Sequence, residues 1–408
     1  LGEKWGVDLP RIPQQPNPHI VNTNWSYTDV PIVNFNAAEA PYNADKTGTT
    51  DATEAIQNAL DDCGNTLGGV VYLPEGTYRL EGNLVFKDGV TLRGDWKEPT
   101  STDKSVAGTV LNIYSSKGED SDVPTVESAI EIGASGGIRD LSIFYPEQDA
   151  SNPVPYPYTI RARSKMQTVM NLTLVNSYKG IRYETSTGTS AVGHPNVYNV
   201  YGSPLKRGIR LNKAAAVPRI VGIDFDPAYW AESGLPASPT KAEVLNAIRS
   251  LESVALELEQ SDNGILGDFK IKGYDVAIGI GMGGLSSNMK VYDFDISQCR
   301  VGVNAVNYKS QGWTFTKGII KVDGEDAMAV KQPGDGILTF NDVAFSSTGK
   351  LVVSTAGSLS FTNCHFQEWN DENGIYMANG SLISYGNIFS KVVEPEQSLI
   401  YLDSGTDA

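Results

Sequence analysis

Short apolar runs that alternate with polar residues fill the chain from residue 68 onward, and polar or glycine-containing corners separate them. The first two runs stand in GGVVYLPEGTYRL (68–80), where a Pro-Glu-Gly turn divides them, and NLVFKDGVTLRG continues the pattern. These corners differ from the two-residue loops that join the strands of β-hairpins. The pattern therefore predicts a chain that winds as a coil of short strands instead of folding back on itself.

A sequence repeat supports this interpretation. Three segments align without gaps, namely NLTLVNSYKGI (171–181), DFKIKGYDVAI (268–278) and DFDISQCRVGV (293–303). Phe269 and Phe294 hold the same position in two of them and are 25 residues apart, and Leu172 lies 97 residues before Phe269. The period is thus about 24 residues, which predicts a solenoid whose coils each contribute strands to parallel sheets.

One amphipathic helix precedes the strands. In TDATEAIQNALDDCG (50–64), Thr50 or Asp51 is positioned as the N-cap, and Ile56 and Leu60 lie on one face. The first coil of a solenoid exposes an open core and a row of unpaired backbone groups. We expect this helix to cover both.

These elements give a predicted domain organisation. Residues 1–64 form an N-terminal arm and the capping helix, and residues 65–408 form a single right-handed parallel β-helix of the all-β class. A loop and helix insertion at about 227–266 is the longest interruption of the period. Insertions in solenoids emerge beside one face and commonly form the wall of a binding groove.

Composition narrows the class of protein. Forty-one glycines, 19 tyrosines and 20% charged residues describe a globular, turn-rich protein. No apolar run approaches the roughly 20 residues of a membrane helix. The opening LGEKWGVDLP lacks the features of a signal peptide, so we expect a trimmed mature form of a secreted or cell-surface protein. The net charge of −16 disfavours nucleic acid and anionic lipid as partners and makes a neutral glycan more natural than a polyanion.

The three cysteines suggest no disulfide framework and no metal site. Cys63, Cys299 and Cys364 are odd in number and far apart in the sequence. We expect all three to be buried as small apolar side chains.

Residues 42–95 resemble the N-terminal signature of the pectate-lyase-like, right-handed parallel β-helix superfamily. The shared features are an Asp-Ala-Thr helix start, a Gly-Gly strand, a Leu-Pro-x-Gly-x-Tyr corner and a Val-Thr-Leu-x-Gly strand, in this order. LSIFYPEQ and the style of the repeat are similar to the family 55 glycoside hydrolases, which are β-1,3-glucanases, and to bacterial family 28-related proteins. The resemblance implies the β-helix fold and a carbohydrate-active function.

The outward face of the coils carries the candidate catalytic residues. If Ile223, Phe269 and Phe294 point into the core, the alternate positions point outward. Neighbouring strands lie about 4.8 Å apart, so aspartates one or two coils apart approach the carboxylate spacings of retaining or inverting glycosidases, about 5–5.5 Å and about 6.5–9.5 Å. The alternative is solvated acidic surface. The candidates for general acid, base or nucleophile are Asp224, Asp226, Asp268, Asp293 and Asp295.

Candidate substrate-binding residues lie near these aspartates. Tyr229 and Trp230 stand at the start of the insertion, where their rings either stack on sugar rings or anchor the insertion by packing. Lys270 and Lys272 alternate with the aspartates, and Gln148 lies in a proline- and tyrosine-rich loop that would form the opposite wall of a groove.

We expect no cofactor, although a structural calcium ion is one use for Asp45 and Asp51. A helix cap explains Asp51 better than a calcium ligand does.

Three functions remain open from the sequence. The leading hypothesis is an extracellular glycoside hydrolase that acts on a largely neutral poly- or oligosaccharide through two of the aspartates. The second is a polysaccharide lyase in which Lys270 or Lys272 abstracts a proton, although the sequence suggests no basic cluster to neutralise a uronate. The third is a non-catalytic carbohydrate-binding or adhesion β-helix. The sequence does not indicate the oligomeric state.

Overall fold

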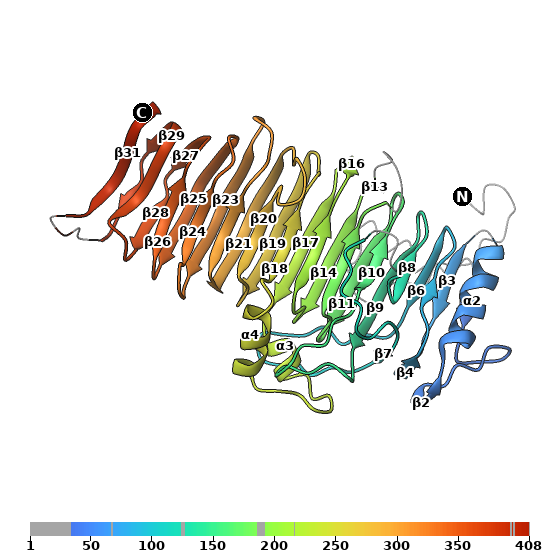
Figure 1. The fold of residues 1–408 in the computed structure, drawn as a ribbon. Coiled ribbons are helices and arrows are strands. Elements are labelled where there is room, and N and C mark those ends of the chain that lie inside the picture. The colour runs from blue at the N-terminus through green and yellow to red at the C-terminus, as the bar shows by residue number, and fades with distance from the viewer. Residues whose placement is uncertain are drawn as a thin grey trace, which may run out of the picture.

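The computed structural model describes residues 34–66, 68–123, 127–185, 192–215, 217–391, 394 and 396–407. In these residues, 29 strands pair into one continuous parallel sheet system. Figure 1 shows an elongated stack of coils, with helix α2 (Thr53–Asn65) at one end and strands β29 (Asn373–Tyr385) and β31 (Ser398–Asp407) at the other. The predicted single parallel β-helix is therefore confirmed. Residues 1–33 of the predicted N-terminal arm lie outside the described residues.

The strands form two sheet surfaces, which we call sheet A and sheet B. Sheet A contains, besides the second half of β29, β1 (Asn34–Asn36), β2 (Thr47–Asp51), β3 (Gly69–Tyr72), β4 (Gly76–Leu80), β6 (Val90–Arg93), β7 (Thr109–Ile113), β9 (Gly137–Phe144), β11 (Thr168–Leu174), β14 (Asn196–Gly202), β17 (Arg219–Phe225), β19 (Gly264–Lys272), β21 (Met289–Cys299), β23 (Trp313–Val322), β25 (Ile337–Ser347), β27 (Ser358–Thr362), β28 (His365–Glu368) and β30 (Ile388–Phe389).

Sheet B contains, besides β31 and the first half of β29, β5 (Leu84–Val85), β8 (Ile130–Ile132), β10 (Tyr158–Ala162), β12 (Lys179–Tyr183), β15 (Arg207–Leu211), β18 (Val254–Leu258), β20 (Val276–Ile280), β22 (Val301–Ala305), β24 (Met328–Gln332) and β26 (Lys350–Ser354). The short strands β13 (Val192–Gly193) and β16 (Ala214–Ala215) pair with each other. Each coil thus places one short strand on sheet B and a longer one on sheet A.

A column of left-handed residues bends the long strands of sheet A. The φ angles in this column lie between 48° and 74°, a region that asparagine, aspartate and glycine tolerate best. Asn171 donates a hydrogen bond of 2.7 Å to Asp140, and Asn199 donates one of 3.0 Å to Asn171, so side chains also bond along the column. The column consists of Asp140, Asn171, Asn199, Gly222, Asp268, Asp293, Lys317, Asp342 and Asn363.

The predicted alternation of apolar and polar positions places the core between the sheets. Phe269 and Phe294, which hold the same repeat position, stack with ring centroids 5.5 Å apart. Phe315, Phe340 and Phe361 continue the stacking, with centroids 4.8 and 5.3 Å apart. The three cysteines are free and buried, as predicted. Stacked rings pair each coil with the next and hold the repeat in register.

Three local details differ from the predicted boundaries. The N-cap position of α2 is Ala52, and Asp51 accepts a hydrogen bond of 3.0 Å from the Thr53 N–H from one residue further out. Strands β1 and β2 come before α2 and pair with β3 and β4, so sheet A begins before residue 65. The insertion is shorter than expected, because β18 already belongs to sheet B.

The insertion contains two helices, α3 (Ala228–Ala231) and α4 (Lys241–Arg249). Thr240 and Glu243 form a capping box at the start of α4, and Val244, Ala247 and Ile248 on that helix are buried. In the described part of the chain, no helix has the length and apolar character to cross a membrane.

Candidate functional site

The structure brings three of the predicted site residues into one row on sheet A. Asp224 on β17 lies beside Lys270 on β19, and Lys270 lies beside Asp295 on β21. Asp226 and Lys272 form a second pair, with 3.4 Å between Lys272 Nζ and Asp226 Oδ2. These five residues therefore share one face, as the alternation predicted.

Asp224 is the most enclosed of the predicted aspartates. It accepts a hydrogen bond from the Tyr229 hydroxyl, which in turn accepts one of 2.9 Å from Lys104 Nζ. Burial raises the pKa of the Asp224 carboxyl, whereas Tyr229 and Lys104 lower it by a smaller amount. A raised pKa is a property of general acids, and it also occurs in structural carboxylates.

The predicted aromatic and amide contacts are buried. Tyr229 is 0% and Trp230 2% exposed, so both rings anchor the insertion by packing and neither presents a free face to a sugar. Gln148 accepts a hydrogen bond of 2.6 Å from the Val154 N–H and donates one of 2.9 Å to the Val154 carbonyl. The side chain of Gln148 therefore holds its own loop together.

Asp268 and Asp293 belong to the left-handed column at the bend of sheet A. Both side chains are exposed, and Asp293 Oδ1 lies 3.5 Å from Lys317 Nζ. A short polar residue at these positions is explained by the backbone conformation alone. Asp45 has a different structural role, because its carboxylate accepts hydrogen bonds of 2.9, 3.0 and 2.8 Å from the N–H groups of Thr47, Thr49 and Thr50 and so holds its turn together.

Sheet B carries a different and larger group of charged side chains. Glu131, Arg161, Arg182, Arg210 and Glu257 lie side by side on β8, β10, β12, β15 and β18, opposite to the apolar positions that face the core. A neighbouring row consists of Tyr158, Lys179 and Arg207. We call these eight residues, together with Glu184, Lys206 and Glu259, the charge cluster.

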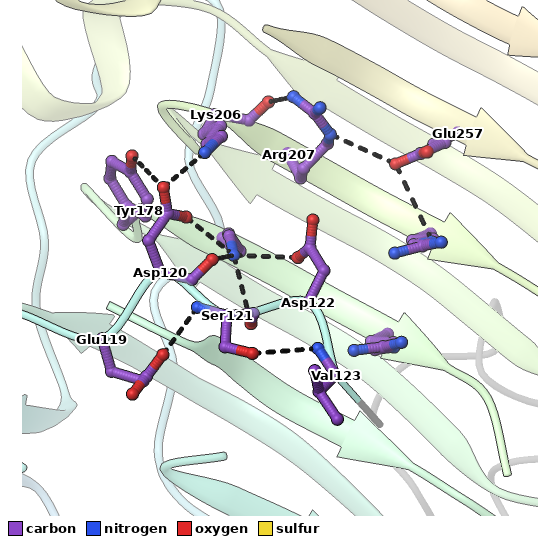
Figure 2. Close-up of polar contacts among 12 residues, drawn as sticks. Glu119, Asp120, Ser121, Asp122, Val123, Tyr178, Lys206, Arg207 and Glu257 are labelled. Carbon is purple, nitrogen blue, oxygen red and sulfur yellow. Dashed lines mark hydrogen bonds and ion pairs between the residues drawn. The ribbon is translucent and has the colours of Figure 1, made fainter. Parts of the chain in front are cut away.

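Close ion pairs connect the charge cluster. Arg182 Nε is 2.8 Å from Glu184 Oε2, and Arg210 Nη2 is 2.8 Å from Glu259 Oε1. Figure 2 shows Arg207 pointing toward Glu257, with 3.2 Å between Arg207 Nε and Glu257 Oε2. Most of these side chains are buried, including Lys179 at 0% and Glu259 at 1% exposure. Buried charges in pairs are costly to build and are common in functional sites.

Several groups in the charge cluster have strongly shifted pKa values, among them Glu259 and Tyr158. Burial raises the pKa of Glu259 to about 7, Arg210 opposes this rise, and the neighbouring Glu257 carboxylate adds to it. Burial also raises the pKa of Tyr158 well above its usual range. The Tyr158 hydroxyl is buried and has no hydrogen-bond partner among the described residues. Near neutral pH, the Glu259 carboxyl is therefore protonated in some molecules and ionised in others.

A groove of about 640 Å³ continues from the charge cluster along sheet B. Its floor is apolar, and its rim carries both signs of charge, including Asp275, Arg300 and Lys350. Arg207 belongs to both the groove and the cluster. The floor is formed by Val254, Val276, Val301 and Met328, one from each of four successive strands.

A second cavity, of about 480 Å³, lies on sheet A. Arg139, Thr168, His194, Tyr198 and Arg219 are among its lining residues. Neither of the two cavities is lined by a predicted catalytic or substrate-binding residue.

Sequence reasoning missed the charge cluster, although a signal for it was present. An Ile-Arg dipeptide recurs at residues 160–161, 181–182 and 209–210, and these pairs hold the same position in three successive coils. Each isoleucine enters the core, and each arginine therefore points outward. Glu184 stands two residues after Arg182, but the acidic partners of Arg161 and Arg210 come from other coils, so the sequence alone did not link the whole group.

Comparison with known proteins supports the fold. Residues 35–130 match the family described as rhamnogalacturonase A/epimerase, pectate lyase-like. The mannuronan C5-epimerase AlgE1 of Azotobacter vinelandii is 37% identical over 93 residues, which cover 20% of this chain and 6% of that protein. The chain thus spans a small fraction of the length of this curated relative.

Two solved structures share the architecture over most of the chain. The Dettilon tailspike protein is 13% identical and superimposes with a TM-score of 0.61, covering 90% of this chain and 68% of that one. The DFA-IIIase of Arthrobacter chlorophenolicus A6 is 14% identical, with a TM-score of 0.51 and coverage of 91% and 92%. At these identities the structural comparisons establish a shared fold.

Proposed function

We propose that this pectate-lyase-like β-helix is a carbohydrate-active enzyme that binds a poly- or oligosaccharide in the groove of sheet B. The observation that carries the proposal is that the groove leads directly into the charge cluster, with Arg207 common to both. An apolar floor with charged edges suits sugars, which have apolar ring faces and polar rims. The names of the matched family and of the epimerase relative, which refer to polysaccharides, agree with this class of substrate.

Hydrolysis is the reaction that we propose first. Glycosidases use one carboxyl group as a general acid and a second as base or nucleophile. Glu259, with a pKa of about 7, suits the role of the acid, and Glu257, whose side chain hydrogen-bonds to it, helps to keep the proton on Glu259. These two carboxyls are closer together than a glycosidase pair, so the second carboxyl would come from the groove rim, where Asp275 is a candidate. We also propose that the protein is secreted or located at the cell surface, where polysaccharides are accessible.

A lyase is the second candidate, and the cationic side chains of sheet B favour it. Lys179 and Arg182 lie on β12 and Arg210 lies on the adjacent β15, where carboxylates pair with all three side chains. Such cations neutralise the carboxylate of a uronate while a base abstracts the proton next to it. A non-catalytic binding function would use the same groove without turnover.

A glycan panel with two readouts tests the proposal. Hydrolysis releases new reducing ends alone, elimination also produces an unsaturated sugar, and a binding protein gives neither. On a confirmed substrate, Glu259→Gln, which removes the proposed acid, should lower kcat by a factor of about 10² to 10⁴. Asp224→Asn, which changes the row on sheet A, serves as the matched variant and should retain nearly full activity. If Asp224→Asn loses activity and the glutamate variant keeps it, the aspartates of sheet A form the active site instead.

A further inference from the structure

The segment Glu119–Val123, which belongs to no strand, lies against the charge cluster (Figure 2). Lys179 Nζ is 2.8 Å from Asp120 Oδ1 and 2.8 Å from Asp122 Oδ1, and Lys206 Nζ is 2.6 Å from Asp120 Oδ2. Lys179 is 0% exposed, whereas the side chains of Asp120 and Asp122 are 37% and 45% exposed. The two carboxylates thus reach solvent, and the cation that they share does not.

The segment attaches to the solenoid mainly through these charges. Lys179 Nζ also donates to the Asp120 carbonyl at 2.8 Å and to the Ser121 carbonyl at 3.4 Å, and the Tyr178 hydroxyl donates to Asp120 Oδ2 at 3.3 Å. Two further hydrogen bonds are internal: the Glu119 carboxylate accepts from the Ser121 N–H at 2.7 Å, and the Ser121 hydroxyl accepts from the Val123 N–H at 3.1 Å. Val123 is 54% exposed, so it adds little apolar burial. The ion pair of Lys206 is partly exposed and contributes little net free energy, whereas the buried Lys179 needs a partner for its charge. A competing anion must therefore supply Lys179 with equivalent charge-assisted hydrogen bonds.

The groups beneath the segment would attract another anion if it left. Lys179 and Lys206 would lose two carboxylates, and Arg182 and Arg207 lie on the same surface. Carboxylates form the short, charge-assisted hydrogen bonds that such cations favour. The groove that continues from Arg207 gives an extended ligand room to follow.

We propose that Asp120 and Asp122 act as an internal ligand, occupying positions that the carboxylates of an acidic glycan take when Glu119–Val123 leaves the charge cluster. This inference rests on the proposed function, because it names the class of glycan for the same groove. It departs from the expectation of a largely neutral substrate, which followed from the net charge. The segment lowers the apparent affinity in proportion to the fraction of molecules in which the site is free.

Hydrogen–deuterium exchange on the unmodified protein tests the displacement. The probe is an oligogalacturonate, and its methyl-esterified form is the control, since it keeps the sugar chain and removes the charges. The oligogalacturonate should increase exchange at the amides of residues 117–123 several-fold, and the ester should leave it unchanged. Unchanged or slower exchange in the presence of bound oligogalacturonate would overturn the proposal, as would the absence of any binding.

A double variant tests the competition. Asp120→Asn with Asp122→Asn keeps the shape of the segment and removes both charges. If the segment occupies the site in about nine of ten molecules, the variant should bind oligogalacturonate about tenfold more tightly. Glu119→Gln is the matched control, because its carboxylate bonds within the segment, and it should bind like the unmodified protein. Equal affinity in a folded double variant would contradict the inference.

The two proposals fail in different ways. If a glycan is turned over while exchange at residues 117–123 stays unchanged, the internal-ligand proposal is wrong and the enzyme proposal stands. If oligogalacturonate releases the segment without any turnover, the internal ligand is supported and the enzyme proposal is wrong. Should the double variant fail to fold, the exchange experiment on the unmodified protein decides alone.

Discussion

At the scale of single residues, burial distinguishes the exposed aspartates in the bend of sheet A from the enclosed carboxylates of the charge cluster. Asp268 and Asp293 are exposed and serve a bend of the backbone. Glu259 is almost fully enclosed, and its carboxyl interacts with the side chains of Glu257 and Arg210. Enclosure makes the acidity of Glu259 depend on its surroundings, which is what acid–base chemistry near neutral pH requires.

The raised pKa of Glu259 predicts a specific dependence of stability on pH. Between the ordinary pKa of about 4.5 and the folded value of about 7, the folded protein binds more protons than the unfolded chain. The stability that Glu259 contributes is therefore fully present below about pH 4.5 and is lost as the pH rises through about 7. Glu259→Gln should remove this part of the decline in Tm. Thermal unfolding of both proteins from pH 5 to 8 measures it, and parallel curves would show that Glu259 ionises normally.

At the scale of elements, the left-handed column explains the positions of Asp268 and Asp293, which the alternation along a strand did not explain. Each long strand of sheet A changes direction at one residue, so the strict inward–outward pattern is reset there. Asp268 and Asp293 were predicted to face outward from a strand as a catalytic pair, yet their positions follow from the bend. Their exposure is consistent with either role, and their backbone angles favour the structural one.

Substitutions at Asp268 distinguish the two roles. Asp268→Asn keeps a residue that tolerates a positive φ, so the free energy of unfolding and the activity should stay close to those of the unmodified protein. Asp268→Val places a β-branched residue at a φ of 48° and should destabilise the fold by about 1–2 kcal/mol. Urea unfolding of both variants, with activity measured on the same samples, checks this. A folded, inactive Asn variant would make Asp268 catalytic after all.

The sequence predicted the solenoid well because its repeat depends on local apolar residues. Phe269 and Phe294 recur in register and stack in the core, and the capping helix follows from its own apolar face. The charge cluster could not be predicted in the same way. Arg182 and Glu184 stand two residues apart, but Glu257 and Asp120 come from distant segments, and their proximity depends on the stacking of coils.

At the scale of the whole molecule, net charge and local charge point to different ligands. The chain carries a net charge of −16, from which the sequence favoured a neutral glycan. Sheet B nevertheless gathers Arg161, Lys179, Arg182 and Arg210 in one region. Salt screens exposed charges beyond about 8–10 Å, so a ligand in the groove responds to these cations more than to distant aspartates. In the proposed site, these cations and the carboxylates paired with them therefore matter more for a ligand than the net charge of the chain.

The direction of the groove gives a final prediction about substrate length. Its lining residues come from β15, β18, β20, β22, β24 and β26, and five strand spacings amount to about 24 Å along the solenoid. Because the charge cluster lies at the β15 end, kcat/KM should rise with oligosaccharide length until the chain spans this distance and then level off. Lys350, on β26 at the far end, contacts only long substrates in this arrangement.

Lys350→Ala should therefore lower kcat/KM several-fold for oligosaccharides that span the groove and leave short ones unaffected. Lys290→Ala, which removes an exposed lysine from sheet A, is the matched control and should change neither. Initial rates on a series of purified oligosaccharides of increasing length measure both effects. Equal losses for short and long substrates would mean that the glycan does not run along sheet B, because a residue five strands from the charge cluster would then act by some route other than direct contact.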